Sequence, residues 1–251
     1  MTDPHELDSQ RGSYAAEFPF FEENRRALEW YAERVEGLAS RSAARRALSL
    51  GIGQRIVCRR LAGALSEGRL DRYVIVEASS AAIGELVEDD ADFSGCEVVE
   101  AWFESFSSHE LFDLVEMGFV LEHVDDPLAI LCRFRDLLTP AGVMAVAVPN
   151  ACSLHRLIGH ASGLLDDPYA LSDADHALGH QRYFDRQSLR DVMAEAGLDI
   201  ELEEGIFLKP LTTAQLAKLE LPESVMTGLF RVAVGLPEIA NALYVEAKRA
   251  G

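Results

Sequence analysis

The sequence predicts an α/β fold in which helices cover a mainly parallel β-sheet. The clearest observation is a strand-helix-strand pattern over residues 112–150, whose length fits a right-handed crossover unit. Within it, residues 143–148 include no polar side chain, which is typical of a strand covered on both faces. Two glycines, Gly51 and Gly53, follow an apolar segment, as they do where a strand turns into a helix.

Size and composition narrow the class of protein. The 251 residues suit one large α/β domain, alone or with a small appendage, and 49% hydrophobic residues supply a full core. The net charge of −19 disfavours nucleic acid and anionic membrane surfaces as partners. The chain has no apolar stretch near about 18 residues and no secretory leader, so we expect a cytoplasmic protein. Four cysteines without CxxC spacing indicate reduced thiols, and we expect no metal site.

The amino-terminal part divides into two segments. Residues 1–13 are polar and expected to be a disordered tail, whereas residues 14–44 are rich in aromatic side chains. Apolar residues at helical spacing, Leu28, Tyr31 and Val35 among them, predict a helix in the second segment. This helix either packs on the domain or acts as a lid over a small-molecule site. Residues 45–251 form the main domain.

In that domain, apolar runs separated by amphipathic segments predict alternating strands and helices. Asp126 followed by Pro127 is a helix start, since an aspartate accepts the free amides of a first turn and proline needs none. Asp185 is predicted to cap a later helix in the same way. The expected strands are 46–50, 72–77, 96–99, 112–115, 143–148, 198–208 and 243–248, and the expected helices include 54–65, 80–88 and those that follow Asp126 and Asp185.

Three details of this assignment are specific enough to be tested. Residues 139–142 are expected to end the helix that follows Asp126, and the strand 198–208 is expected to bend or break at Gly205. The glycine-rich stretch 157–180 is expected to be an irregular loop. Together with the helical segment 209–238, residues 151–184 would form an insertion that covers a substrate.

Candidate site residues follow from the fold class, because open parallel sheets bind ligands beyond the carboxyl ends of their strands. Here those ends lie near residues 118–123 and 149–156. Glu77 ends the second strand, the position from which an acid hydrogen-bonds a ribose diol. A helix-capping role is the alternative for Glu77.

The order of these motifs resembles the class I S-adenosylmethionine-dependent methyltransferases. The resemblance rests on LSLGIG, VIVEAS, FDLVEMGFVLEHVDDP and AGVMAVAVPN, and it covers about residues 45–150. More loosely, PNACSLHRLIG, LGHQRYFD and LKPLTTAQL resemble a bacterial small-molecule subgroup from natural-product and saccharide pathways. The resemblance implies a Rossmann-like sheet of seven strands whose last strand is antiparallel, flanked by helices, with a cap inserted after the fifth strand.

It also implies a set of cofactor-binding residues. The methionine part would contact Gly51, Gly53 and Gln54, and the ribose would contact Glu77 beside Ala78. The adenine would lie on Ala101, Trp102 and Phe103, and the wall beneath the transferred methyl would comprise Gly118, Phe119 and His123. Three positions depart from the family pattern, namely Ser49 in place of an acid, Arg55 in place of a small residue and Ala101 in place of an acid near the adenine.

Methyl transfer to a hydroxyl needs alignment and a base, and a neutral histidine suits that task near pH 7. The candidate bases are His123, His155, His176 and His180, with Asp175 able to orient an imidazole. The candidate substrate contacts are Asn150, His155, Arg156 and Tyr183, and Arg182 is a further cation able to bind a substrate anion.

The leading hypothesis is therefore methyl transfer to a hydroxyl, carboxyl or amine of a small metabolite, with O-methylation favoured and a homodimer left open. The three departures motivate an alternative, a catalytically weak or inactive methyltransferase-like binding protein. A nicotinamide-dependent oxidoreductase shares the glycine turn and Glu77 but fits LEHVDDP and the long excursion before the final strand less well.

Overall fold

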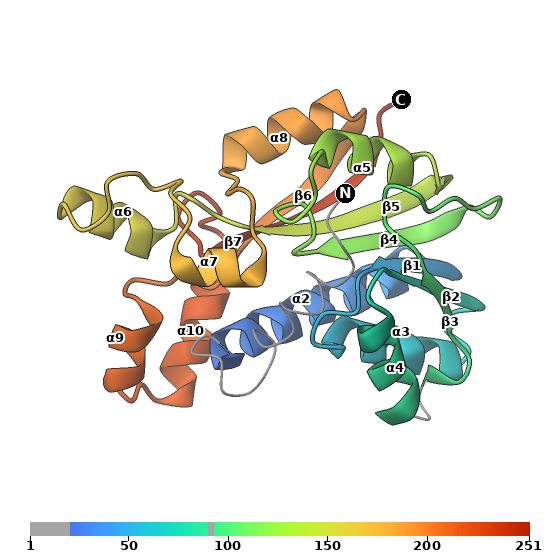
Figure 1. Cartoon of the computed structure of the whole chain (residues 1–251), viewed down its shortest axis with the longest axis horizontal. Coiled ribbons are helices and arrows are strands. Elements are labelled where there is room, and N and C mark those ends of the chain that lie inside the picture. Colours follow the sequence, from blue (N-terminus) through green and yellow to red (C-terminus); the bar gives the residue numbers. More distant parts are fainter. Residues whose placement is uncertain (1–20, 90–92) are drawn as a thin grey trace.

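The computed structural model of the chain describes residues 21–89 and 93–251 and has a seven-stranded sheet at its centre (Figure 1). The strand order is β3-β2-β1-β4-β5-β7-β6, in which the first five are parallel and β7 runs antiparallel to both β5 and β6. The predicted fold is thus confirmed. The strands are β1 (Arg46–Leu50), β2 (Arg72–Glu77), β3 (Glu97–Glu100), β4 (Phe112–Gly118), β5 (Leu138–Pro149), β6 (Leu198–Ile206) and β7 (Ala242–Arg249).

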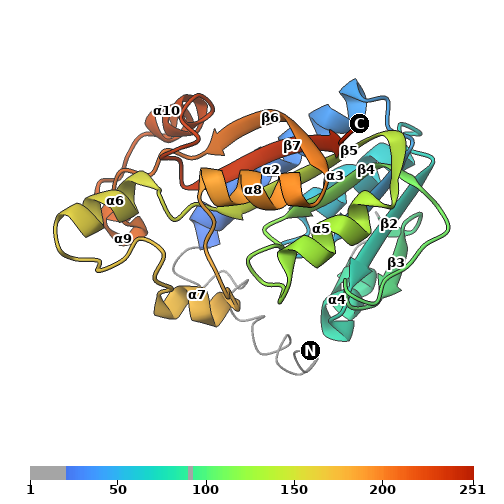
Figure 2. The same ribbon diagram turned by 90° about the horizontal axis from the view of Figure 1, so that it is seen from above.

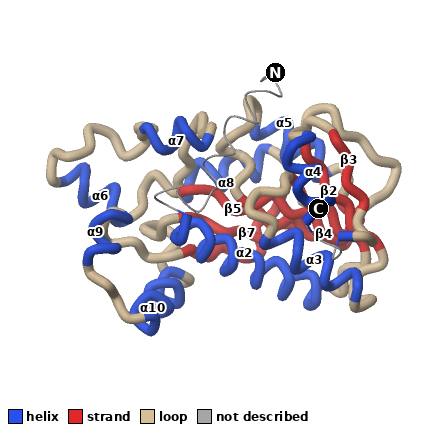
Figure 3. The backbone as a smooth tube through the Cα atoms, turned by 60° about the horizontal axis from the view of Figure 1, so that its bottom comes forward, coloured by secondary structure: helices blue, strands red, loops and turns tan. Residues whose placement is uncertain are grey.

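Helices cover both faces of the sheet, as its almost wholly apolar central strands require. One face packs against α2 (Phe21–Arg41), α3 (Ile56–Ser66) and α4 (Ser80–Asp89), and the other against α5 (Pro127–Arg135) and α8 (Arg186–Glu195) (Figure 1). The remaining helices gather beyond one end of the sheet (Figures 2 and 3): α6 (Leu154–Ala161), α7 (Asp173–Leu178), α9 (Thr213–Lys218) and α10 (Glu223–Ala233). Among the described residues, no helix combines the length and the hydropathy needed to cross a membrane.

Both predicted helix caps are present. Asp126 accepts a hydrogen bond from the amide of Ala129 at 3.0 Å and precedes Pro127 at the start of α5. Asp185 accepts the amide of Ser188 at 2.7 Å at the start of α8. The four cysteines are free, as expected. The predicted tail, residues 1–13, lies outside the described residues.

Three local predictions were wrong. Residues 157–180 are not irregular throughout, because α6 extends to Ala161 and a capping box between Ser172 and Asp175 starts α7. Residues 139–142 belong to β5 rather than to a helix stop, and the Thr139 hydroxyl donates to Asp113 on β4 at 3.1 Å. The register shift of β6 lies between Ile200 and Leu202, not at Gly205.

The start of α3 is also later than predicted, at Ile56 instead of Gln54. Gly51, Gly53 and Arg55 all have positive φ, at 82°, 50° and 65°. Left-handed backbone of this kind cannot continue a right-handed helix, so the turn extends through Arg55. Arg55 departs from the family pattern at this turn, and its strained conformation is one that glycine adopts without penalty.

Helix α2 both packs on the domain and borders a cavity, so the two alternatives for this segment are not exclusive. Tyr31 is fully buried against the sheet, and its ring packs edge-on against Phe119 and Tyr244 at 6.2 and 5.8 Å. Leu28, one turn earlier, lines the cavities described below. Phe18 and Phe20, which the sequence placed in the same aromatic segment, lie outside the described residues.

Gly118 ends β4 directly beneath Tyr31. A Cβ added at Gly118 would lie 2.2 Å from Cε1 of the Tyr31 ring, far inside van der Waals contact. Only glycine therefore allows α2 to approach the end of β4 this closely.

We expect Gly118→Ala to destabilise the protein by about 1–3 kcal/mol, because the buried Tyr31 ring must shift to admit the methyl group. Urea unfolding monitored by circular dichroism measures this change. Gly228→Ala is the control, since a Cβ at this position in α10 meets no atom within 4 Å and the substitution favours helix. Equal unfolding midpoints for the two variants would contradict the packing argument.

Candidate active site

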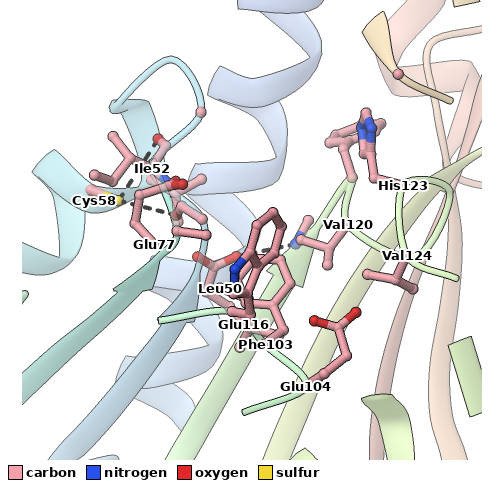
Figure 4. A pocket seen from close by; sticks show the side chains of 18 of the residues that line it. Leu50, Ile52, Cys58, Glu77, Phe103, Glu104, Glu116, Val120, His123 and Val124 are labelled. Carbon is pink, nitrogen blue, oxygen red and sulfur yellow. Dashed lines mark hydrogen bonds between the residues drawn. The ribbon is translucent and has the colours of Figure 1, made fainter. Parts of the chain in front are cut away.

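A cavity of about 320 Å³ opens at the carboxyl ends of β1, β2 and β4. Ten of the eleven residues predicted to bind cofactor line it, namely Gly51, Gly53, Gln54, Glu77, Ala78, Trp102, Phe103, Gly118, Phe119 and His123. In Figure 4, Glu77 and Ile52 stand on one side of this cavity and His123 on the opposite side. The eleventh, Ala101, is not among the lining residues, and its amide donates to the Glu77 carbonyl at 2.9 Å.

Glu77 holds the glycine turn in place. Its Oε2 accepts the amide of Ile52 at 3.0 Å, and its Oε1 accepts the amide of Ser79 at 2.8 Å. The helix cap itself is Ser79, whose hydroxyl accepts the amide of Ala82 at 3.1 Å, so Glu77 orders the capping residue and is not the cap that the sequence left open. Each carboxylate oxygen has two lone pairs, so both oxygens can also accept a hydroxyl from the cavity. Glu77 therefore fits a ribose diol while it orders the turn beside it.

A second acid, Glu116 on β4, lines the same cavity although it is almost fully buried. Its Oε2 accepts the Tyr31 hydroxyl at 3.0 Å and the Gly118 amide at 3.2 Å. Burial raises the pKa of Glu116 to about 7, although hydrogen bonds from Ser49, Gly118 and Tyr31 oppose the rise. Sequence reasoning missed this residue, and the signal that could have found it is an acid between Val115 and Met117, in the apolar part of β4.

A second cavity of about 250 Å³ adjoins the first and lies beneath α6 and α7. Both cavities are lined by Leu28, Gly53, Gln54, Gly118, Phe119 and His123, so these residues stand between them. The second cavity takes in the four predicted substrate contacts, Asn150, His155, Arg156 and Tyr183, together with the predicted base His180.

Two of those predicted substrate contacts are occupied by structural hydrogen bonds. Asn150 donates to the carbonyls of Pro237, Glu238 and Ala240, and thereby fixes the segment before β7. Arg156 donates to carbonyls in the connection between α6 and α7, and its guanidinium lies 4.2 Å from the centre of the Tyr183 ring. Because their donors are engaged with backbone carbonyls, these two residues shape the cavity and are poorly placed to bind a substrate in it.

His180 Nδ1 lies 3.3 Å from Asp175 Oδ1 in the second cavity, within ion-pair distance but without the angles of a hydrogen bond. Burial alone would raise the pKa of Asp175, but the His180 ring and the hydroxyls of Ser172 and Tyr183 outweigh it and hold that pKa well below its usual range. Asp175 is therefore ionised near neutral pH. A carboxylate beside Nδ1 favours the imidazole tautomer with its proton on Nδ1, which leaves Nε2 as the basic atom.

The other candidate bases are placed differently. His123 lies edge-on to His180, with ring centres 4.8 Å apart, and burial followed by the His180 charge lowers the pKa of His123 to about 3. His155 has a pKa lowered to about 3 by burial and by the nearby cations Lys209 and Arg156. His176 is exposed on α7 and lines neither cavity.

Glu122 is a further buried acid that the sequence analysis did not select. Neither of its carboxyl oxygens has a hydrogen-bond partner among the described residues, and burial raises its pKa to about 7. One ligand atom each from Glu122, His123 and His180 lie within 4.8 Å of one another, an arrangement open to a metal ion. The absence of a metal site stays a prediction.

The segment that carries His180 is bonded to the loop that follows β4. The side-chain amide of Gln181 donates to the His123 carbonyl at 2.8 Å, and its backbone amide donates to the Glu122 carbonyl at 2.8 Å. Arg182 donates to the carbonyls of Leu121, Val124 and Asp125, so this predicted substrate cation is engaged with the backbone instead. The segment that carries His180 and the loop that separates the two cavities thus form one hydrogen-bonded unit.

Comparison with known proteins decides the family. A family model described as a methyltransferase domain matches residues 20–203, which is more than half of the chain. The chain belongs to this methyltransferase family. The predicted family and enzyme class are therefore confirmed, and the cavity at the strand ends is the candidate active site of a methyltransferase.

Three known methyltransferases are similar to this chain. A ubiquinone biosynthesis O-methyltransferase of Parvibaculum lavamentivorans is 29% identical over 104 residues, a match that spans 41% of this chain and only 40% of that relative. The N-methyltransferase NodS of Bradyrhizobium japonicum, solved with S-adenosylhomocysteine, superposes with a TM-score of 0.60 at 13% identity, covering 99% of this chain and 100% of that one. The Burkholderia thailandensis 1,6-didemethyltoxoflavin-N1-methyltransferase superposes with a TM-score of 0.58 at 15% identity, covering 100% and 92%.

The raised pKa of Glu116 gives a prediction for stability. Between its ordinary pKa of 4.5 and about 7, Glu116 keeps its proton in the folded protein and loses it in the unfolded chain. This contribution to folding is complete below about pH 4.5 and is lost as the pH rises through about 7. Glu116→Gln removes the titration, so from pH 5 to pH 8 we expect the variant to gain stability relative to the parent by on the order of 3 kcal/mol at most.

Urea unfolding of both proteins at several pH values measures this difference. The opposite pKa shifts of His123 and His155 affect both proteins equally and cancel in the comparison. A difference in unfolding free energy that stays constant from pH 5 to pH 8 would show that Glu116 does not titrate in this range.

Proposed function

We propose that this methyltransferase uses S-adenosylmethionine to methylate a hydroxyl group of a small metabolite. The observation that carries the proposal is the proximity of His180 and Asp175 in a cavity that adjoins the candidate cofactor cavity, since an imidazole beside a carboxylate can serve as a base. Carboxyl and amine groups are the other acceptors that the family admits, and a hydroxyl has the greatest need of a base.

The residues of the first cavity fit the cofactor. The glycine turn allows close approach of a ligand, the carboxylate of Glu77 suits a ribose diol, and Trp102 and Phe103 offer an aromatic surface to adenine. Trp102 and Phe103 follow β3, Glu77 ends β2 and Gly118 ends β4, so the order across the sheet matches adenosine followed by methionine. S-Adenosylmethionine supplies an electrophilic methyl carbon, which is transferred by in-line displacement.

The chain's own residues would hold and deprotonate the acceptor. In the second cavity, Nε2 of His180 would take the hydroxyl proton while the ionised Asp175 stabilises the resulting imidazolium. Gly118, Phe119 and His123 border both cavities and would fix the distance between the acceptor and the methyl group. Neutral His123 adds no positive charge beside the sulfonium.

The size of the second cavity, about 250 Å³, favours a small-molecule substrate. The net charge of −19 argues against nucleic acid as a partner, and no described contact bears on the homodimer that the sequence left open. Glu23, Lys209 and Thr213 join α2 to the segment at α9 by partly buried hydrogen bonds of 2.6–2.8 Å, and Glu23 and Lys209 border this cavity. They add polar groups with which a polar metabolite can exchange hydrogen bonds.

One other function remains as an alternative. The departures at Ser49, Arg55 and Ala101 support a methyltransferase-like binding protein with little activity, whereas the match to a methyltransferase domain excludes the nicotinamide-dependent enzyme. Against the binding protein stands the pair of His180 and Asp175 in the second cavity, which a binding protein does not need. The ubiquinone O-methyltransferase relative favours oxygen as the acceptor, whereas the two structural neighbours named above methylate nitrogen.

We expect His180→Asn and Asp175→Asn to lower kcat by about 100-fold or more, because the first removes the base and the second its orienting carboxylate. Affinity for S-adenosylhomocysteine should change less than about threefold, since neither residue lines the cofactor cavity. The assay is methyl transfer to a panel of hydroxylated and carboxylated metabolites, with calorimetry for binding. His176→Asn is the matched control on the same helix as Asp175; activity equal to that control in both variants would remove the base from the proposal.

We expect Glu77→Ala to weaken binding of S-adenosylhomocysteine by about 100-fold, because it removes the ribose contact and two hydrogen bonds that hold the glycine turn. Isothermal titration measures the affinity, with NADH and NADPH as competing cofactor classes. Glu100→Ala is the control, since Glu100 is the exposed register partner of Glu77 on β3. Binding of NADH alone would contradict the proposed cofactor, and unchanged affinity would remove Glu77 from the site.

A further inference from the structure

Glu116 occupies a position that compensates for the missing acid of β1. Proteins of the resembled family usually have an acidic residue two positions before the first glycine, where this chain has Ser49. Ser49 and Glu116 are register partners on the adjacent parallel strands β1 and β4. Side chains of register partners on parallel strands project from the same face of the sheet. Glu116 therefore provides a carboxylate on the face from which the acid of the family projects, but from β4 instead of β1.

The surroundings of Glu116 are polar but contain no cation. Its carboxylate accepts the Tyr31 hydroxyl and the Gly118 amide, and the Ser49 hydroxyl lies 2.8 Å from that of Tyr73. Among the described residues no lysine, arginine or histidine forms an ion pair with Glu116, which is 3% exposed. The Cys58 thiol and the Tyr73 hydroxyl also interact electrostatically with Glu116, and both are uncharged near neutral pH because burial raises the pKa of each.

A buried carboxylate without a cation is unfavourable in the folded protein. An apolar residue at position 116 would avoid that cost. Leu114, Val115 and Met117 of the same strand are apolar and fully buried. Glu116 borders the cofactor cavity, so a cation that enters this cavity can reach it. The position of the acid is thus explained if the missing cation arrives with the ligand.

We propose that Glu116 binds the α-ammonium group at the methionine end of the cofactor, and so acts from β4 as the counter-ion that β1 lacks. This inference rests on the proposed use of S-adenosylmethionine. The ammonium group has N–H donors for the carboxylate, whereas the sulfonium has none. Glu116 accepts the Gly118 amide at 3.2 Å and pairs in register with Ser49, two residues before the glycine turn, so it lies beside the residues that the methionine part would contact.

The test compares two ligands and two proteins by isothermal titration. The ligands are S-adenosylhomocysteine and its analogue in which hydrogen replaces the amino group, and the proteins are the parent and Glu116→Gln. We expect the parent to prefer the amino ligand by about 30-fold or more and Glu116→Gln to prefer it by less than about threefold. Binding of the analogue should be similar in the two proteins, which also shows that the variant is folded.

The possible outcomes separate this inference from the proposed function. A parent that binds both ligands equally, or a variant that keeps the full preference, overturns the role of Glu116 while leaving the cofactor assignment intact. A parent that binds neither ligand overturns the cofactor assignment itself. A variant that loses affinity for both ligands equally shows that Glu116 supports the shape of the cavity and not the ammonium group.

A second variant tests the position of the charge. Combining Ser49→Asp with Glu116→Ser returns the carboxylate to β1 and keeps one acid and one hydroxyl on the same face. We expect this double variant to recover at least a tenfold preference for the amino ligand over its analogue. The single Glu116→Ser variant is its control, and an equal lack of preference in both would show that the carboxylate acts only from β4.

Discussion

The hydrogen bond from Tyr31 to Glu116, 3.0 Å long, connects the amino-terminal helix to the centre of the sheet. It fixes the distance between α2 and the end of β4, and that distance defines the wall shared by the two cavities. Gly118 makes the contact sterically feasible, and the Gly118 amide donates to the same carboxylate. One polar contact inside an apolar core therefore determines both the position of a helix and the shape of the candidate site.

The sequence predicted the fold well because its strands and helices are locally consistent. The apolar runs of β2, β4 and β5 and the caps Asp126 and Asp185 each specify one element, and each element is present. The boundaries were less accurate where tertiary contacts decide them. The left-handed backbone at Arg55 delays α3, and the hydrogen bond between Thr139 and Asp113 draws residues 139–142 into β5.

The candidate site was predicted residue by residue only where position in the fold is sufficient. The strand ends supplied the lining of the first cavity, with Ala101 as the exception because its amide is bonded to the Glu77 carbonyl. Asn150 and Arg156 fell in the second cavity, but their partners are backbone carbonyls that no local pattern reveals. Glu116 and Glu122 were missed because their significance depends on burial and on neighbours distant in the chain.

The bonds from Gln181 and Arg182 to the loop after β4 have an evolutionary consequence. They join His180 to the wall shared by the two cavities, whereas α6, which lies beyond the end of the sheet (Figure 1), contributes His155 and Arg156 to the second cavity. Substitutions in α6 can therefore reshape the second cavity while His180 keeps its spacing from the first. Under the proposed function, related enzymes with new substrates can arise by changes confined to that helix.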